Sequence, residues 1–79
     1  MKATILVRPK QGILDPQGEA VQSSLRQLGF PVDETRVGRV IDLELENGDV
    51  EAARGELEAM CEQLLANPLI ESYEIVVVG

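Results

Sequence analysis

Apolar and polar positions along the chain follow two different periods, which divide it into strand-like and helix-like segments. Residues 2–8 (KATILVR) are rich in β-branched side chains and stop at Pro9, which is typical of a strand. Residues 32–46 have a period of two, with apolar side chains on one face and acidic side chains on the other. Residues 69–78 (LIESYEIVVV) predict a last strand.

The segment after the first strand has the spacing of an amphipathic helix. Asp15 predicts an N-cap, and Pro16 fits the first helical position, where its missing N–H costs nothing. Gly29 and Pro31 predict the end of this helix. The apolar residues at helical spacing are Val21, Leu25 and Leu28.

A second helix follows the predicted turn and cap at residues 47–49 (Asn-Gly-Asp). It ends before Pro68, because a residue that precedes proline is driven out of the helical backbone region. Its predicted core face consists of Val50, Ala53, Leu57, Met60, Cys61 and Leu64.

The order of these elements predicts an α+β fold. Two helices on one face of a small antiparallel or mixed sheet give a two-layer sandwich, with ferredoxin-like βαββαβ topology as the leading arrangement. Gly38 interrupts the middle segment, either as a hairpin turn between two strands or as a bulge in one long bent strand, which would give βαβαβ. Residues 1–79 form a single domain in either case.

The last strand predicts a need for burial on both faces of the sheet. Ile75, Val76, Val77 and Val78 form an unbroken apolar run, so side chains on both faces avoid water. One layer of helices covers only one face. We therefore expect the other face to pack against another subunit, with these four residues as candidates for self-association in a homodimer or tetramer.

Composition narrows the classes of function. At 79 residues the chain is near the lower limit for a stable core, and its single cysteine and lack of histidine exclude an internal disulfide and the usual zinc sites. A net charge of −7 disfavours nucleic acids and anionic membranes as partners. No apolar run reaches the roughly 20 residues that span a bilayer, and residues 1–10 do not fit a signal peptide. We expect a cytoplasmic protein.

The stretch LDPQG, residues 14–18, has two compatible interpretations. Asp15 and Pro16 fit the positions of a helix cap. Loops at helix N-termini are also favoured places for partners, and Gln17 and Lys10 would be the exposed contacts there. The cap would then fix a loop that binds another molecule.

Other candidate groups also have a structural and a functional interpretation. Arg36, Gly38 and Arg39 form a local cationic cluster that either solvates a turn or contacts an acidic partner surface, for which arginine is well suited. Cys61 is predicted to be core, because it lies on the apolar helix face and the chain has no histidine to activate it. The sequence contains no glycine-rich phosphate loop and no carboxylate pair of the kind that hydrolases use. These residues predict a non-catalytic module.

Three stretches follow one another over essentially the whole chain: LDPQG, the segment from VGR to IDLEL, and LLANPLIE. Together they resemble the PurS family of phosphoribosylformylglycinamidine synthase subunits. Each is weak alone, and their joint order and spacing make the resemblance specific. The matching residues are 14–18, Arg36, Gly38, Arg39, 65–68, Ile70 and Glu71. Arg39 stands where lysine is common in the family, so the charge is retained.

The resemblance implies a non-catalytic subunit of a glutamine-dependent ligase of purine biosynthesis. In that family a large subunit binds ATP and magnesium, and a glutaminase subunit releases ammonia with its own cysteine. The small subunit dimerises, holds these two together and supports ammonia transfer. This chain is then expected to hold no cofactor, metal or catalytic residue. The candidate partner contacts are Lys10, Asp15, Pro16, Gln17, Gly18, Arg36, Gly38, Arg39, Asn67, Pro68 and Glu71.

Two other functions fit the same fold. A ligand-sensing module of the ACT type also pairs βαββαβ units, and its melting temperature would shift on binding an amino acid or nucleotide. An acylphosphatase-like enzyme is disfavoured, because its phosphate loop with arginine and glycine is absent from VRPKQGILD. Fold alone does not separate these possibilities, whereas the ordered motifs favour the PurS-like subunit.

Overall fold

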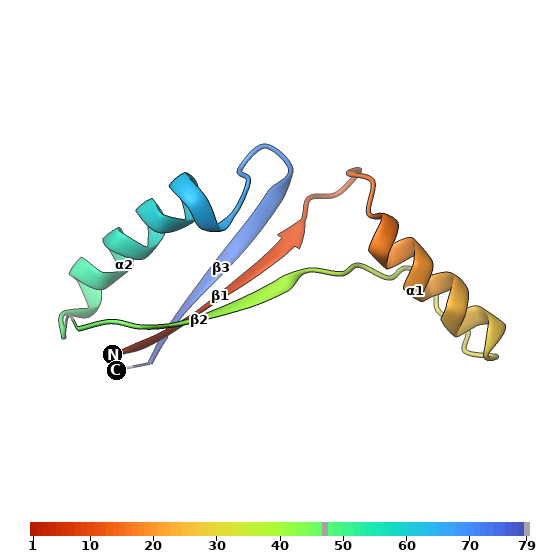
Figure 1. Ribbon diagram of the computed structural model, residues 1–79, viewed down its shortest axis with the longest axis horizontal. Helices are drawn as coiled ribbons and strands as arrows, with labels where there is room; N and C mark the ends of the chain where they lie inside the picture. The colour runs from red at the N-terminus through yellow and green to blue at the C-terminus, as the bar shows by residue number, and fades with distance from the viewer. Residues whose placement is uncertain (47, 79) are drawn as a thin grey trace.

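The computed structural model describes residues 1–46 and 48–78 of the chain. The elements run in the order β1 (Lys2–Pro9), α1 (Pro16–Gln27), β2 (Arg39–Glu44), α2 (Val50–Met60), the π-helical turn η1 (Cys61–Leu65) and β3 (Glu71–Val78), as Figure 1 shows. Helices and an antiparallel sheet in this order confirm the α+β class. Asn47, part of the predicted turn, lies outside the described residues.

The three strands form one antiparallel sheet in the order β2-β1-β3. Ile5 of β1 lies opposite Ile41 on one side and Ile75 on the other, so the central strand is paired along both edges. The middle segment supplies the single strand β2, so the described chain reads βαβαβ and the alternative of a hairpin at Gly38 is wrong. Gly38 instead sits just before β2, where a Cβ atom would collide with the carbonyl oxygen of Val7.

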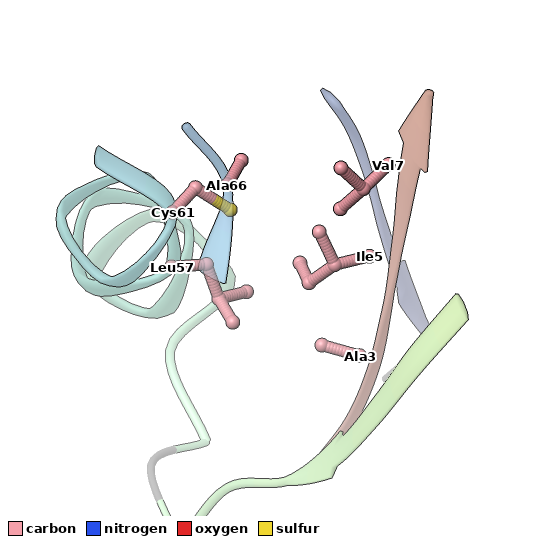
Figure 2. Close-up of a cluster of buried hydrophobic side chains, with 6 residues drawn as sticks. All are labelled: Ala3, Ile5, Val7, Leu57, Cys61 and Ala66. Atoms are coloured by element: carbon pink, nitrogen blue, oxygen red, sulfur yellow. The ribbon is translucent and has the colours of Figure 1, made fainter. Parts of the chain in front are cut away.

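The core lies between β1 and α2 (Figure 2). Alternate side chains of β1 point toward α2, and the cluster of buried residues consists of Ala3, Ile5, Val7, Leu57, Cys61 and Ala66. The burial of Cys61 confirms that it is a core residue.

The predicted core face of the second helix is wrong at its two ends. Val50 and Leu64 are 45% and 82% exposed. Beyond Met60 the backbone winds into the wider π-helical turn, in which the Ala66 N–H donates to the Cys61 carbonyl at 3.0 Å. A wider turn rotates the side chains that follow it, so Leu64 leaves the core face while Ala66 enters the core.

The position of α1 differs from the predicted pair of helices on one face. Only α2 lies over the sheet, whereas α1 projects beyond the sheet's end (Figure 1). Within the described chain, the main packing contacts between elements join the strands, α2 and η1, and α1 takes part in none of them. The radius of gyration is 15.7 Å, against about 12 Å for a compact domain of this length. The fold therefore consists of a small two-layer body, formed by the sheet and α2, and of the helix α1, which projects from it.

The face of the sheet opposite α2 is uncovered in the described structure. Ile75 and Val77 point toward α2 and are half-buried, whereas Val76 and Val78 point the other way and are 40% and 62% exposed. The apolar run thus has side chains on both faces, as its sequence indicates. Burial of the second face by another subunit stays a prediction.

Candidate interaction site at the neck

The three motif stretches of the sequence converge at the end of the sheet from which α1 projects. We call this region the neck and define it as residues 9–15, 35–39 and 65–71. Backbone and side-chain hydrogen bonds join the three segments: the Lys10 N–H donates to the Ile70 carbonyl at 2.8 Å, and the Val37 N–H donates to the Asp15 carboxylate at 2.9 Å. Residues that are far apart in the chain therefore form one surface.

Asp15 caps α1 and also ties it to the chain that returns to the sheet. Its Oδ1 accepts from the Gly18 N–H at 3.0 Å, which confirms the predicted N-cap. Its Oδ2 accepts from the Val37 N–H, and the bonds from Val37 and then Gly18 lower the pKa of the carboxyl. Gly18 is buried at this contact, and a Cβ atom at its position would collide with Asp15 and with the Thr35 carbonyl. The LDPQG stretch thus caps α1 and also binds the start of α1 to the segment around Val37.

Arg36 and Lys10 are occupied within the neck. The Arg36 guanidinium donates to the Pro9 carbonyl and, at 2.6 Å, to the Lys10 carbonyl, and it lies 3.4 Å from Glu34. Lys10 donates its Nζ to the Pro68 carbonyl at 2.6 Å. These cations therefore donate to backbone carbonyls at the end of β1 and in the loops next to it, which is a structural use of their charge.

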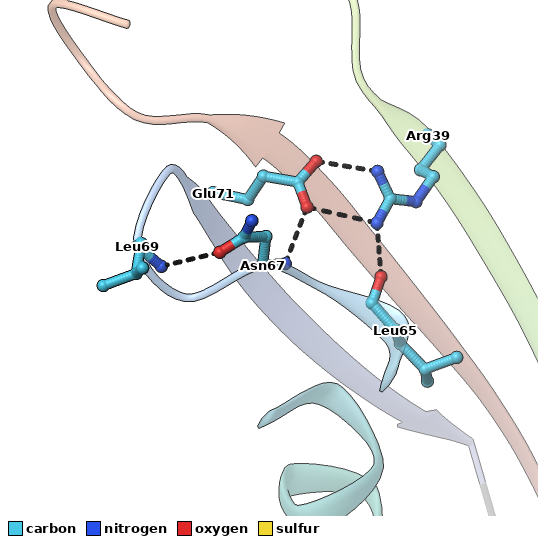
Figure 3. Close-up of polar contacts among 5 residues, drawn as sticks. All are labelled: Arg39, Leu65, Asn67, Leu69 and Glu71. Atoms are coloured by element: carbon cyan, nitrogen blue, oxygen red, sulfur yellow. Dashed lines mark hydrogen bonds and ion pairs between the residues drawn. The ribbon is translucent and has the colours of Figure 1, made fainter. Parts of the chain in front are cut away.

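Arg39 forms the second polar junction of the neck (Figure 3). Its guanidinium donates to both oxygens of Glu71, at 2.7 and 3.2 Å, and to the Leu65 carbonyl. Glu71 also accepts from the Asn67 N–H at 2.7 Å. Arg39 lowers the pKa of Glu71, with a further contribution from Asn67, and Glu71 raises the pKa of Arg39. A lysine would keep the charge but not this forked geometry, so charge alone does not account for arginine here.

A notch of about 240 Å³ opens between the base of α1 and the sheet. Its apolar lining includes Ile13, Leu14 and Ile70, of which Leu14 is 73% exposed and Ile70 42% exposed. The polar lining includes Gln17 and the Arg39–Glu71 pair. Sequence reasoning did not place Ile13 at the site, because it fits neither the strand nor the helix pattern.

The predicted contact residues all lie in or beside the neck, but they play different parts there. Those that hold the neck together are Asp15, Gly18, Arg36, Gly38, Arg39 and Glu71. Those exposed at its surface are Lys10, Pro16, Gln17, Asn67 and Pro68, of which Lys10, Asn67 and Pro68 also take part in hydrogen bonds of the neck. Which of them touches another molecule stays a prediction.

Two titratable side chains outside the neck, Tyr73 and Cys61, are hydrogen-bonded and buried, respectively. The Tyr73 hydroxyl donates to Glu62 at 2.9 Å, and this bond raises the pKa of Tyr73. Burial raises the pKa of the Cys61 thiol. The described residues contain no group of three or more ligating side chains placed to hold a metal. No helix in the described part of the chain has the length and apolar character needed to cross a membrane.

The neck carboxyls predict a loss of stability in acid. Asp15 and Glu71 have pKa values below their ordinary 3.8 and 4.5, so the folded chain binds fewer protons than the unfolded chain at low pH. Their contribution is complete above the ordinary values and disappears as the pH falls through the folded values. We expect the free energy of unfolding, measured in urea, to decline below about pH 4.5. Glu71→Gln should make the free energy of unfolding depend less steeply on pH in this range. An unchanged pH dependence would contradict the stabilising role of the Arg39–Glu71 pair.

Comparison with known proteins extends over nearly the whole chain. The family PurS, described as phosphoribosylformylglycinamidine (FGAM) synthase, matches residues 2–79. The phosphoribosylformylglycinamidine synthase subunit PurS of Methanocaldococcus jannaschii is 43% identical over 75 residues, which are 94% of this chain and 90% of that protein. The protein of the same name from Synechocystis is 49% identical over 70 residues, which are 87% of this chain and 70% of that protein.

Solved structures show the same similarity. A PurS subunit from Thermotoga maritima has a TM-score of 0.88 at 37% identity, over 98% of this chain and 90% of that chain. A chain in the structure of PurLQS from the same organism also has a TM-score of 0.88 at 37% identity, over 98% of this chain and 95% of that chain. The α+β arrangement, with its projecting helix, is thus similar to folds determined for these proteins.

Proposed function

The chain belongs to the PurS family, and on that premise we propose that it is a small subunit of phosphoribosylformylglycinamidine synthase in purine biosynthesis. The observation that carries this proposal is the match to residues 2–79, because it includes both the body and α1. Similarity to a chain of the PurLQS structure supports a place in a complex with other subunits. Such a complex works in the cytoplasm.

In this proposal the chain connects other subunits and does not perform chemistry. The large ligase subunit binds ATP and magnesium, the glutaminase subunit supplies ammonia, and this chain holds the two together so that ammonia passes between them. A connecting role is supported by the charged side chains of the neck, which bind to other parts of the same chain. Arg36, Arg39 and Glu71 act within the neck as cross-links, which fixes a surface in advance and so reduces the entropy lost on binding.

The neck is the proposed contact with the synthase subunits. Its outer surface includes the notch, where the apolar side chains of Leu14 and Ile70 lie beside the polar side chain of Gln17. An apolar centre with a polar margin is the usual arrangement of a protein interface. Lys10 and Pro68 lie next to each other on the same surface, through the bond from the lysine Nζ.

Reconstitution of the synthase tests the connecting role. The large subunit, the glutaminase subunit and this chain are mixed, and turnover is measured with glutamine and then with ammonia as the nitrogen source. Omission of this chain should reduce the glutamine-dependent rate far more than the ammonia-dependent rate, because free ammonia bypasses the transfer. Equal losses of both rates, with the other two subunits still assembled, would point to a direct part in the ligase step instead.

The same assay tests the neck surface through Gln17→Ala. This side chain is exposed, and the neck's hydrogen bonds do not depend on it, so the melting temperature should stay unchanged while binding to the large subunit weakens. Gln63→Ala is the matched control, because it removes the same side chain from an exposed position of η1 outside the notch. If both variants bind as tightly as the unaltered chain, the contact lies elsewhere.

The proposal also includes pairing with a second copy of the chain. The seven buried apolar residues of the described structure make a small core for a domain of this length. Val76 and Val78 remain exposed on the open face of the sheet. Burial of such surfaces against a second copy is the usual means by which chains of this size gain stability.

A further inference from the structure

The segment that leads from η1 to β3 carries the two most exposed large apolar side chains of the described chain. Leu64 is 82% exposed and Leu69 is 84% exposed. Neither belongs to the core cluster or packs against it. We call residues 64–70 the corner. Because these two leucines are left in water, they add almost nothing to the stability of the chain's own fold.

Further apolar side chains adjoin the two leucines. Ile70 follows Leu69 directly and lines the notch together with Leu14. Ile70 is 42% exposed and Leu14 is 73% exposed. Apolar side chains that are scattered singly are normal on a protein surface, whereas a group of them at one place is typical of an interaction site.

Hydrogen bonds fold the corner into a closed turn (Figure 3). Arg39 donates to the Leu65 carbonyl and to Glu71, so the two ends of the segment are held together. Within the turn, the Asn67 Oδ1 accepts from the Leu69 N–H at 3.1 Å, and the Leu69 side chain points away from the Arg39–Glu71 pair. A turn that is fixed in advance loses little conformational entropy when another molecule binds it.

The helical surface that leads to the corner is acidic. Residues 50–65 contain four glutamates and one arginine. Glu58 and Glu62, in the last turns before the corner, are exposed. The hydrogen bond to Glu62 raises the pKa of Tyr73, and the negative charges of Glu62 and Glu58 raise it further. The electrostatic potential beside the corner is therefore negative.

This charge favours a different protein over a second copy as the molecule that covers the corner. A two-fold contact places the same patch of both copies together, so the glutamates of one copy would face those of the other. Like charges that meet in an interface oppose binding. A surface with an apolar centre and a margin of lysine or arginine would complement both the leucines and the glutamates.

We propose that the corner inserts Leu64 and Leu69 into an apolar recess with a basic margin on another subunit of the synthase. The proposal rests on the proposed function and adds to the notch a second place of contact, with the chemistry of the surface that receives it. Gln63 belongs to the polar margin of this contact, where truncation of a side chain costs little affinity, so it remains a control for the notch.

Alanine substitutions test the two leucines in the reconstituted synthase. The dissociation constant of this chain from the complex is measured by titration with fluorescently labelled chain. Leu64→Ala and Leu69→Ala should each weaken binding about tenfold or more, because each removes an apolar side chain that the partner buries. Their melting temperatures should stay unchanged, since both side chains are exposed.

Val50→Ala is the matched control for the leucines. Val50 is another exposed apolar residue, 45% exposed, and it lies at the start of α2, about 20 Å from Leu64 along the helix. This variant should bind the complex like the unaltered chain. Unchanged affinity of both leucine variants, or an equal loss with Val50→Ala, would overturn the inference.

Reversal of charge tests the basic margin of the recess. Glu58→Lys should weaken binding several-fold and make it less sensitive to added salt, because salt screens the attraction between opposite charges. Glu46→Lys changes the net charge equally at an exposed position outside the corner, so its effect should be small. Equal effects of the two variants, or tighter binding of Glu58→Lys, would contradict a basic margin and overturn the inference.

A chain with both leucine substitutions separates this inference from the alternatives. It should self-associate in sedimentation like the unaltered chain. Loss of self-association with unchanged binding to the synthase would show that a second copy covers the corner, and would overturn the inference. Tight binding of this variant to the synthase overturns the inference and leaves the proposed function standing, whereas failure of the unaltered chain to bind overturns both.

Discussion

Gly38→Ala should destabilise the chain by about 3 kcal/mol, which is a large fraction of the total stability of so small a domain. A Cβ atom at this position would collide with the Val7 carbonyl oxygen and would lie 3.3 Å from the Arg8 Cα atom. These are backbone atoms of β1, the central strand, which pairs along both edges and cannot move aside alone. Urea unfolding at fixed protein concentration measures the loss.

Gly55→Ala is the matched control for this prediction. Gly55 lies on the exposed side of α2, and a Cβ atom there would meet nothing within 4 Å. Because alanine favours helices more than glycine does, this variant should be more stable by roughly 0.8–1 kcal/mol. The same substitution thus has opposite signs at the two positions. A small effect at Gly38 would mean that the approach of β2 to β1 is looser than the structure shows.

Leu57→Ala should lower the free energy of unfolding by about 2–5 kcal/mol, because it leaves a cavity in the centre of the core. Leu57 is completely buried and points from α2 toward Ile5 on β1 (Figure 2). Few other side chains share this core, so the neighbours have little freedom to close the cavity. The measurement is again urea unfolding at fixed protein concentration.

Leu64→Ala tests whether that loss comes from burial rather than from helix content. Leu64 belongs to the next helical turn and is 82% exposed, so its removal should change the free energy of unfolding by no more than about 0.5 kcal/mol. The sequence pattern assigns Leu57 and Leu64 to the same core face and so predicts similar losses for both variants. The structure buries only Leu57 and so predicts a large loss for Leu57→Ala alone. Similar losses of stability for the two variants would contradict the turning of the Leu64 side chain away from the core by η1.

The features of the fold that depend on interactions between residues close together in the sequence were predictable. Asp15 and Asp49 cap the two helices as their residue types indicate, because a cap depends on N–H groups only two or three residues away. The outer bounds of the strands were less predictable than their existence: β-branched composition or alternation indicated all three, but β2 covers only Arg39–Glu44 of residues 32–46, and β3 starts at Glu71 and not at Leu69. In these cases the sequence neighbours supply the interaction that decides the structure.

The position of α1 and the connections of the neck were not predictable in this way. A stripe such as Val21, Leu25 and Leu28 indicates that a helix face requires cover, but it does not indicate which surface covers it. The bond from Val37 to Asp15 spans 22 positions, and no local pattern announces it. Arg36 and Arg39 were identified as candidate cations, whereas the backbone carbonyls among their acceptors have no signature in a sequence.

The separation of α1 from the core has a consequence for the chain's motions. A 12-residue helix without tertiary packing is only marginally stable in water, so its backbone amides exchange with solvent through local fraying. Amides in the centre of β1 exchange only when the whole body opens, because neighbours on both edges hold them. A solitary copy therefore has two rates of opening, a fast one in α1 and a slow one in the sheet. Any molecule that covers α1 brings the two rates together.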